Sequence, residues 1–334
     1  MKGVSEVKSL NHLLPAAAKD NMYAAGITRA KIDWIWGMNM TRLYTKHFGA
    51  LCSVGRVQTA VVNMIVQRDE EISNFTKKPY FKLKLDNGAE WFSDEQDSFP
   101  TRAEAESVKA KCENSLCKVV YVNAKQKKEN RPLLFSLTSL QVEANDKLGF
   151  SAATTLAVMQ SLYEKKMLTY PRTDSSYLTE DMAAVLEERV GMVRVMNEAA
   201  DDVLAAGLNI DSRIINNSKV SDHHAIIPTE YIANAAGAEL SANEKAVLDM
   251  VITRFLAALS PQYEYTETEY VFEVCGEHFK CKTKTPKIFG WKRFYADSGD
   301  ENAVTIAYAE GHSFEAKDLT EHNNRAAVLH NRPL

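Results

Sequence analysis

Residues 168–175 read Leu-Thr-Tyr-Pro-Arg-Thr-Asp-Ser, and three alternate side chains in this stretch could carry out phosphoryl transfer. Pro171 has a fixed φ and favours an extended conformation before it, so Tyr170, Arg172 and Asp174 can project from one side. A phenolate is the nucleophile, but a free phenol has a pKa of about 10 and needs a cation to ionise at neutral pH. Arg172 could supply that charge and bind the phosphate. A surface ion pair between Arg172 and Asp174 fits the same pattern.

A second stretch, residues 222–229, reads Asp-His-His-Ala-Ile-Ile-Pro-Thr. Its paired histidines, His223 and His224, could hydrogen-bond a phosphate, pack in the core, or ligate a metal ion. Neighbouring ligands are sterically awkward on one ion, and no third His or Cys follows at zinc-like spacing, so we expect no metal site. A histidine held by a carboxylate such as Asp174 would be a suitable phosphate partner.

A third stretch, residues 52–59, reads Cys-Ser-Val-Gly-Arg-Val-Gln-Thr and opens a predicted helix. A small, glycine-containing loop lets backbone amides approach an anion, and the helix N-terminus carries partial positive charge. Arg56 adds a full charge, and Gln58 and Thr59 can donate hydrogen bonds to phosphate or base edges. An ordinary helix start has the same pattern.

Composition and charge narrow the class of protein without naming a partner. The 334 residues suggest two or three domains, and 45% hydrophobic with 25% charged residues exclude a disordered chain. A formal net charge of −4 is compatible with a nucleic-acid partner, since a cleft can be basic in an acidic protein. No apolar run approaches the roughly 18 residues of a membrane span, and no secretory signal opens the chain, so we expect a cytoplasmic protein. The five cysteines form no Cys-x-x-Cys pair and predict no zinc ribbon.

The candidate residues lie in the first quarter of the chain and in its middle, and the sequence predicts helices in both parts that would position them. Apolar spacing predicts one helix capped by Thr28 and another over 57–72. In the middle it predicts helices over 138–148 and 151–166, joined as in a helix-turn-helix. A further helix begins with a capping box at Ser241.

Strands are expected on both sides of the middle helices. Residues 80–85 alternate polar with apolar side chains before an Asn-Gly turn, and residues 118–124 form another candidate strand. After the helices, residues 269–274 and 278–282 predict a hairpin, and residues 304–308 a last strand. The β region is therefore interrupted by a helical insert that joins it through two crossings, which is a natural hinge arrangement.

Together, the three stretches resemble type IA DNA topoisomerases, and among them the topoisomerase III branch. The resemblance extends from about residue 29 to residue 295. It implies a multidomain α and β fold that is part of the type IA torus. The expected parts are an α-helical base segment (1–77), a β-rich arch in two halves (78–131 and 261–321), an inserted, winged-helix-like helical gate domain with the catalytic tyrosine (132–260), and a tail returning to the base (322–334).

The resemblance also implies roles for single residues. Tyr170 would attack one DNA strand and keep its 5′ phosphate as a phosphotyrosine ester. Arg172 would position that phosphate, and His223 would hold it with Asp174 as its neighbour. The residues expected to bind DNA are Ser53, Arg56, Gln58, Thr59, Arg29, Arg42, Arg68, His224, Thr173 and Ser175.

Two departures from the family pattern concern the metal and the extent of the chain. The family's acidic Asp-x-Asp-x-Glu triad is absent, and the sequence stops where the family returns to the base. We therefore expect a central fragment of a larger enzyme, with Mg²⁺ bound by ligands outside this chain and little activity in the fragment alone. The implied substrates are single-stranded DNA and negatively supercoiled or catenated DNA. The resemblance also allows a helicase partner for the complete enzyme. We expect a monomer with no membrane association.

Three other interpretations remain open at this point. A non-catalytic winged-helix module would bind duplex DNA reversibly through the helix-turn-helix and form no covalent adduct. A tyrosine recombinase would need a His-x-x-Arg before its tyrosine, whereas here the histidine pair follows Tyr170. A chain that has lost catalysis could survive as a scaffold. Strand cleavage without ATP is consistent with the absence of a Gly-x-x-x-x-Gly-Lys-[Ser/Thr] loop.

Overall fold

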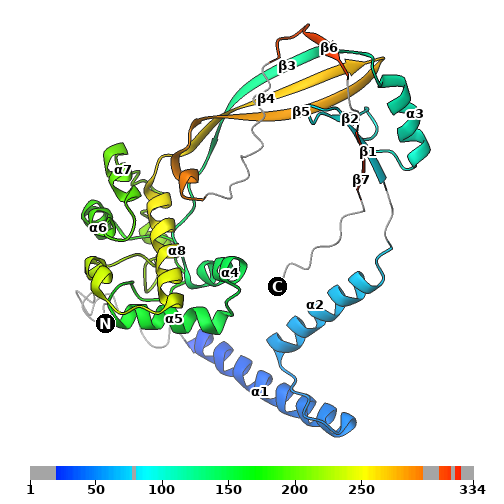
Figure 1. Cartoon of the computed structure of the whole chain (residues 1–334). Helices are drawn as coiled ribbons and strands as arrows, with labels where there is room; N and C mark the ends of the chain where they lie inside the picture. The colour runs from blue at the N-terminus through cyan, green and yellow to red at the C-terminus, as the bar shows by residue number, and fades with distance from the viewer. Residues whose placement is uncertain (1–19, 77–79, 296–307, 317–319, 325–334) are drawn as a thin grey trace. The chain divides into compact units, whose positions relative to one another are not determined.

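A computed structural model describes residues 20–76, 80–295, 308–316 and 320–324 of the protein. The chain divides into two compact units (Figure 1), one of residues 1–79 with 325–334 and one of residues 80–324. In the described parts of both units, no helix is both long and apolar enough to span a bilayer.

The smaller unit contains two helices, α1 (Asp20–Phe48) and α2 (Arg56–Ser73), joined by a loop. The loop is held against α1, because Thr41 Oγ1 accepts a hydrogen bond from Val54 N at 2.9 Å. The helix predicted over 57–72 is confirmed. The predicted Thr28 cap is wrong, because the chain is already helical at Asp20. The residues before Thr28 include two alanines, which favour helix over a cap.

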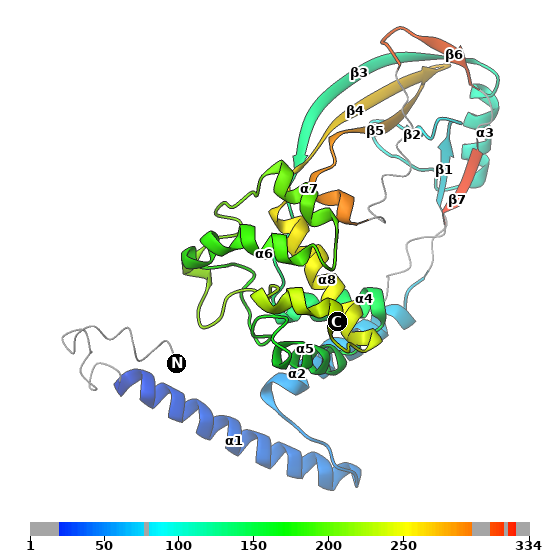
Figure 2. The ribbon, with the colours of Figure 1, turned by 60° about the vertical axis from the view of Figure 1, so that its left-hand side comes forward.

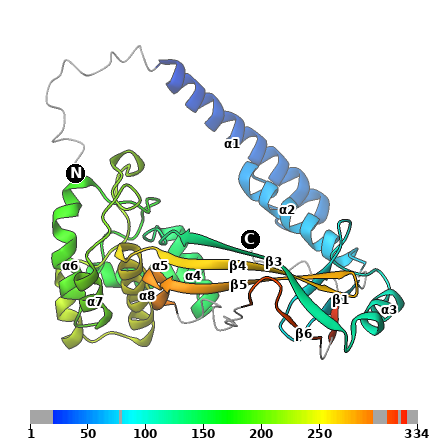
Figure 3. The same cartoon turned by 90° about the horizontal axis from the view of Figure 1, so that it is seen from above.

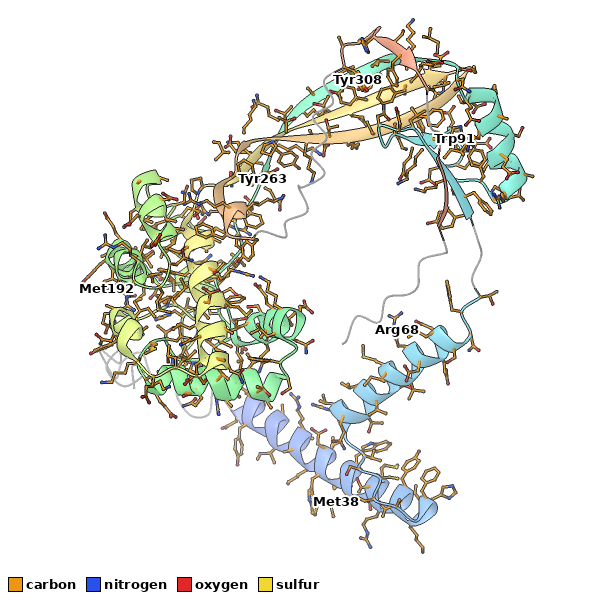
Figure 4. All side chains as sticks on the ribbon, in the orientation of Figure 1. Met38, Arg68, Trp91, Met192, Tyr263 and Tyr308 are labelled. Atoms are coloured by element: carbon orange, nitrogen blue, oxygen red, sulfur yellow. The ribbon has the colours of Figure 1, made fainter. Side chains whose placement is uncertain are left out.

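The larger unit contains one antiparallel sheet, with strands in the order β6-β3-β4-β5-β2-β1-β7. Figure 3 shows β3, β4 and β5 running side by side as its long central strands. A small apolar core lies between the sheet and α3; Trp91, which Figure 4 labels, packs there against Phe99 with ring centroids 4.1 Å apart. The elements are β1 (Tyr80–Lys84), β2 (Glu90–Phe92), α3 (Arg102–Cys112), β3 (Leu116–Glu129), β4 (Tyr263–Val274), β5 (Glu277–Ile288), β6 (Ser313–Glu315) and β7 (Thr320–Asn324).

Both predicted hairpins are present. β1 pairs with β2, and β4 pairs with β5 through a two-residue turn in which Cys275 and Gly276 have φ of 51° and 80°. Two positive φ values are what the right-handed twist of a tight hairpin requires. α3 was not predicted. The strand predicted over 304–308 lies outside the described residues except for Tyr308, which is not in a strand.

The helical insert predicted between the strands leaves and re-enters the sheet at adjacent positions. β3 ends at Glu129 and β4 begins at Tyr263, and these two residues are paired in the sheet. The helices between them are α4 (Leu137–Leu148), α5 (Ala152–Glu164), η4 (Glu180–Val185), α6 (Leu186–Val193), α7 (Ala199–Ala206), η5 (Asn217–Lys219), η6 (Glu230–Gly237) and α8 (Ala242–Leu259). The predicted turn between α4 and α5 is present, with Gly149 at φ 67°.

α8 is the central helix of the insert (Figure 2), and most of its apolar side chains are fully buried. They include Leu248, Ile252 and Phe255, which share one core with Leu140 of α4 and Leu162 of α5. This core makes the insert a folding unit with a hydrophobic centre of its own, separate from the core under the sheet.

The Glu244 carboxylate joins the start of α8 to the end of α5. It accepts hydrogen bonds from Lys165 Nζ at 2.7 Å, Ser161 Oγ at 2.7 Å and Ser241 N at 2.8 Å. These donors, the Lys165 ammonium foremost, lower the pKa of Glu244 to about 2. The capping box predicted at Ser241 is confirmed, and its carboxylate also ties two helices together.

We expect Glu244→Gln to lower the free energy of unfolding by about 1–3 kcal/mol at pH 7, because three donors lose a charged acceptor that is itself buried. The folded-state pKa lies below the ordinary value of 4.5, so this contribution is present above pH 4.5 and declines as the pH falls toward 2. Urea unfolding of wild type and variant should show a difference in the free energy of unfolding that is smaller at pH 3 than at pH 7. Asp249→Asn, exposed on the same helix, is the control. An equal gap at both pH values would contradict this role.

Candidate functional site

In the segment that carries Tyr170, the chain bends at Thr169 and Pro171, and buried and exposed residues alternate from Pro171 to Ser175. Thr173 and Ser175 are buried, whereas Arg172 and Asp174 are exposed and Tyr170 is half-buried. Alternate residues of an extended chain face opposite sides. Tyr170, Arg172 and Asp174 are therefore all accessible from solvent, and the shared outward face of the three side chains stays a prediction.

The segment of the histidine pair lies antiparallel to the Tyr170 segment. Thr169 N donates to Ile227 O at 3.0 Å, and Thr229 N donates to Met167 O at 3.0 Å. This pairing places two motifs that are far apart in the sequence at one surface. The Tyr170 and His223 rings lie there with centroids 4.4 Å apart and planes tilted by 45°.

Thr173 and Ser175, predicted to contact DNA, point inward instead, which corrects that prediction. Thr173 Oγ1 donates to His223 O at 2.8 Å and accepts from Ser175 N at 3.1 Å. Ser175 Oγ donates to Lys219 O at 2.9 Å. Both hydroxyls form hydrogen bonds with backbone groups of the protein. They therefore hold in place the segment that carries Tyr170 and Arg172.

Arg172, Asp174 and His223 are all exposed on this surface. Within residues 80–295, no ion pair joins Arg172 to Asp174, so the surface ion pair of the alternative interpretation is not formed. The expected contact between Asp174 and His223 is not made in the same part of the chain either. In this part of the chain the guanidinium of Arg172 has no acidic partner, so it is available to an anion from outside.

A surface hollow of about 530 Å³ lies beside Tyr170, and we call it the nucleophile hollow. Its lining includes Tyr163, Lys166, Tyr170, His224, Thr229 and Tyr231. Tyr163 meets the Tyr170 ring edge-on at 5.5 Å, and Lys166 Nζ lies 5.3 Å from the centroid of the Tyr231 ring. His224, predicted to bind DNA, is half-buried with Nδ1 2.8 Å from Ala225 O.

Sequence reasoning missed Tyr163, Lys166 and Tyr231. Tyr163 lies at the end of α5 among apolar residues, where its spacing is that of a core side chain. Tyr231 lies in η6, a segment with no motif to mark it. Only the antiparallel pairing of the two motif segments reveals that these residues surround Tyr170.

A second hollow, of about 890 Å³, lies within the smaller unit, and we call it the Arg56 hollow. Four of the residues predicted to bind DNA line it together with Trp36 and Tyr44; they are Ser53, Arg56, Gln58 and Thr59. Arg56 Nε lies 3.5 Å from Asp33 Oδ1, and its side chain is half exposed. The other three predicted arginines do not line this hollow; Arg29 and Arg42 are exposed on α1, and Arg68 pairs with Glu71 on α2.

In the part of the chain that the structure describes, no group of three or more His, Cys, Asp or Glu side chains could hold a metal ion. The described residues therefore do not fit a Mg²⁺ site of their own.

Comparison with known proteins decides the family. The family model described as DNA topoisomerase matches residues 17–331. The chain belongs to this DNA topoisomerase family. It is 40% identical to DNA topoisomerase 3 of Bacillus licheniformis over 317 residues, which cover 90% of this chain and 43% of that protein. It is also 37% identical to DNA topoisomerase 3 of Bacillus subtilis, over 90% of this chain and 43% of that protein. The resemblance to type IA enzymes of the topoisomerase III branch is confirmed.

A solved topoisomerase has the same fold. The chain superimposes on full-length topoisomerase I from Thermotoga maritima with a TM-score of 0.70 at 23% identity, covering 90% of this chain and 50% of that one. The expected α and β topoisomerase fold is thus present at the level of the chain trace. The chain spans only about two fifths of the length of the topoisomerase 3 relatives that it matches, 43% and 41% for the first two.

We expect Thr173→Val to lower the free energy of unfolding by about 1–3 kcal/mol, because it leaves His223 O and Ser175 N without their buried partner. Urea unfolding measures this loss. Asp174→Asn, at the next and exposed position, should change stability by less than about 0.5 kcal/mol. Equal stability of Thr173→Val and wild type would show that the hydroxyl does not hold this segment.

Proposed function

We propose that this chain carries the DNA-cleaving tyrosine of a topoisomerase III-like type IA enzyme. In this proposal Tyr170 opens one DNA strand, another strand passes through the opening, and the break is resealed without ATP. The observation that carries it is the meeting of two motifs: the Tyr170 and His223 ring centroids lie 4.4 Å apart, and Arg172, two residues after Tyr170, is exposed. Family membership supports the same conclusion.

The chemistry needs each of these three groups. The Tyr170 phenol gives up its proton to solvent, and its oxygen attacks the phosphorus while the bond from phosphorus to the 3′ oxygen breaks. The departing 3′ oxygen takes one proton from solvent, so the exchange balances. The products are a phosphotyrosine ester on the 5′ side and a free 3′ hydroxyl. One phosphodiester replaces another, so reversal reseals the strand with no outside energy. Arg172 stabilises the phenolate and the charge that grows on the phosphoryl oxygens. The His223 imidazole can donate a hydrogen bond to one of these oxygens.

The Arg56 hollow has the composition of a single-strand site. Bases of an unpaired strand can stack on the aromatic rings of Trp36 and Tyr44, which line it beside the charge of Arg56. Gln58 and Thr59 add side-chain hydrogen-bonding groups in the same hollow. We therefore propose that this hollow holds the strand to be cut, and that the substrate is single-stranded, negatively supercoiled or catenated DNA.

Strand passage requires the helical insert to swing away from the sheet, and we place the hinge at the two crossings. Polar contacts span them. Arg254 Nε of α8 donates to the Tyr295 hydroxyl at 2.8 Å, and the Arg254 guanidinium also contacts Glu143. Trp291 Nε1, beyond β5, donates to Glu129 O at 3.2 Å, where the first crossing begins. Phe294, just beyond β5, also packs against the apolar core of the insert, so opening the joint breaks both polar and apolar contacts.

We expect the complete protein that contains this chain to form a covalent adduct with a labelled single-stranded oligonucleotide that survives denaturation. Tyr170→Phe should abolish the adduct, because phenylalanine has no oxygen to attack phosphorus. Tyr177→Phe, which removes a hydroxyl seven residues away, is the control and should keep it. Adduct formation by Tyr170→Phe at the wild-type level would refute the proposal. Reversible binding with no adduct from any form would favour the non-catalytic winged-helix module.

We also expect the isolated 334-residue chain to relax supercoiled plasmid poorly or not at all. It corresponds to 41–43% of its first relatives, and its described residues offer no metal site. A gel relaxation assay with full-length Bacillus subtilis DNA topoisomerase 3 as the positive control measures this. Relaxation by the chain at the rate of that control would contradict the expectation.

A further inference from the structure

The nucleophile hollow is not explained by the proposed cleavage step. The step uses Tyr170, Arg172 and His223, but only Tyr170 lines the hollow. The other side chains around it are larger and more aromatic than a phosphate site needs. Tyr163 and Tyr231 are 38% and 44% exposed, so part of each ring is accessible from solvent.

The charges around the hollow favour a base over a phosphate. Two carboxylates lie in its lining: Glu230 pairs with Arg189 at 2.6 Å, and Glu164 accepts from Gln160 Nε2 at 3.0 Å. Carboxylates repel phosphate oxygens but accept hydrogen bonds from the amino groups of bases. The ammonium of Lys166 is engaged over the Tyr231 ring. Rings for stacking and acceptors for amino groups together form a nucleobase site.

The floor of the hollow is held in a defined conformation. Lys166 has φ of 63°, which a non-glycine residue adopts only when its surroundings enforce it. Lys166 N donates to Tyr163 O at 2.8 Å, and the Thr229 hydroxyl donates to Lys166 O. Thr229 N also donates to Met167 O at 3.0 Å, so the turn between Tyr163 and Tyr170 is anchored to the histidine segment. A site built this way is formed before its ligand arrives.

We infer that the nucleophile hollow binds the base of the nucleotide directly 3′ of the scissile phosphate, by stacking it on Tyr163 or Tyr231. This inference rests on the proposed function, because that nucleotide is the one whose 5′ phosphate Tyr170 takes over. Its base must therefore stay within reach of Tyr170 throughout the life of the covalent intermediate. The phosphate faces Arg172 and His223, and the base enters the hollow on the Tyr163 side. Base binding here would hold the cut end in place until resealing.

The test compares two single-stranded oligonucleotides in the complete protein. Both have the same single cleavage site. The first carries a base on every nucleotide, and the second has an abasic residue directly 3′ of the scissile phosphate. With wild-type protein at subsaturating concentration, the abasic oligonucleotide should give about 5- to 150-fold less covalent adduct, the range expected for one stacked base. On the intact oligonucleotide, Tyr231→Ala and Tyr163→Leu should form less adduct than wild type. On the abasic oligonucleotide, these variants and wild type should form nearly the same amount. Tyr231→Phe should behave like wild type.

The comparison with the abasic oligonucleotide distinguishes base stacking on Tyr163 or Tyr231 from a structural role of these residues. A residue that merely supports Tyr170 would lower the adduct by the same factor on both oligonucleotides, and that result would overturn the inference. So would a wild-type protein that cleaves both oligonucleotides equally. Tyr121→Ala, a ring on β3 that is also 44% exposed, is the matched control and should leave both yields unchanged. If wild-type protein forms no adduct on either oligonucleotide, the proposed function itself fails.

Discussion

The antiparallel pairing of the Tyr170 segment with the histidine segment is the constraint on which the rest of the site depends. Buried backbone groups must find partners, and here neither segment belongs to a sheet that could supply them. Thr169 solves this by donating from its N–H to Ile227 O and accepting at its hydroxyl from Ile227 N. Register follows from these bonds, and register sets which rings meet. A slip by one residue would turn His223 away from Tyr170.

The scaffold around this pairing has two levels of rigidity. Inside the insert, α8 brings a continuous apolar face to the core, and Glu244 ties it to α5, so the helices move as one body. At the crossings, the hydrogen bonds of Arg254 and Trp291 lie beside the apolar packing of Phe294 on the core of the insert. In the proposed function, the insert would swing about this joint as one body while the surface that carries Tyr170 stays unchanged. We propose that one face of this surface serves the phosphate and that the adjoining hollow serves the base.

Most of the fold could be predicted because its signals are local. Alternating side chains predict the strands, an Asn-Gly pair predicts the first hairpin, and Ser241 with Glu244 predicts the start of α8. The failures have local causes too. α3 is mostly polar, with only Ala105 and Cys112 buried, and the alanines before Thr28 extend α1 past an apparent cap. The order of three motifs was enough to predict the family, since matches in one order rarely arise by chance.

The sequence by itself determined that a phenol and a guanidinium stand two residues apart, at Tyr170 and Arg172, because the order of residues is fixed by the chain alone. Tertiary structure decided everything that depends on a second segment. It turned the Thr173 hydroxyl inward, since a buried carbonyl of His223 needed a donor. It also brought the Tyr231 ring to the hollow beside the nucleophile. Such contacts join residues far apart in the chain, and the register between them is set by packing, which no local pattern records.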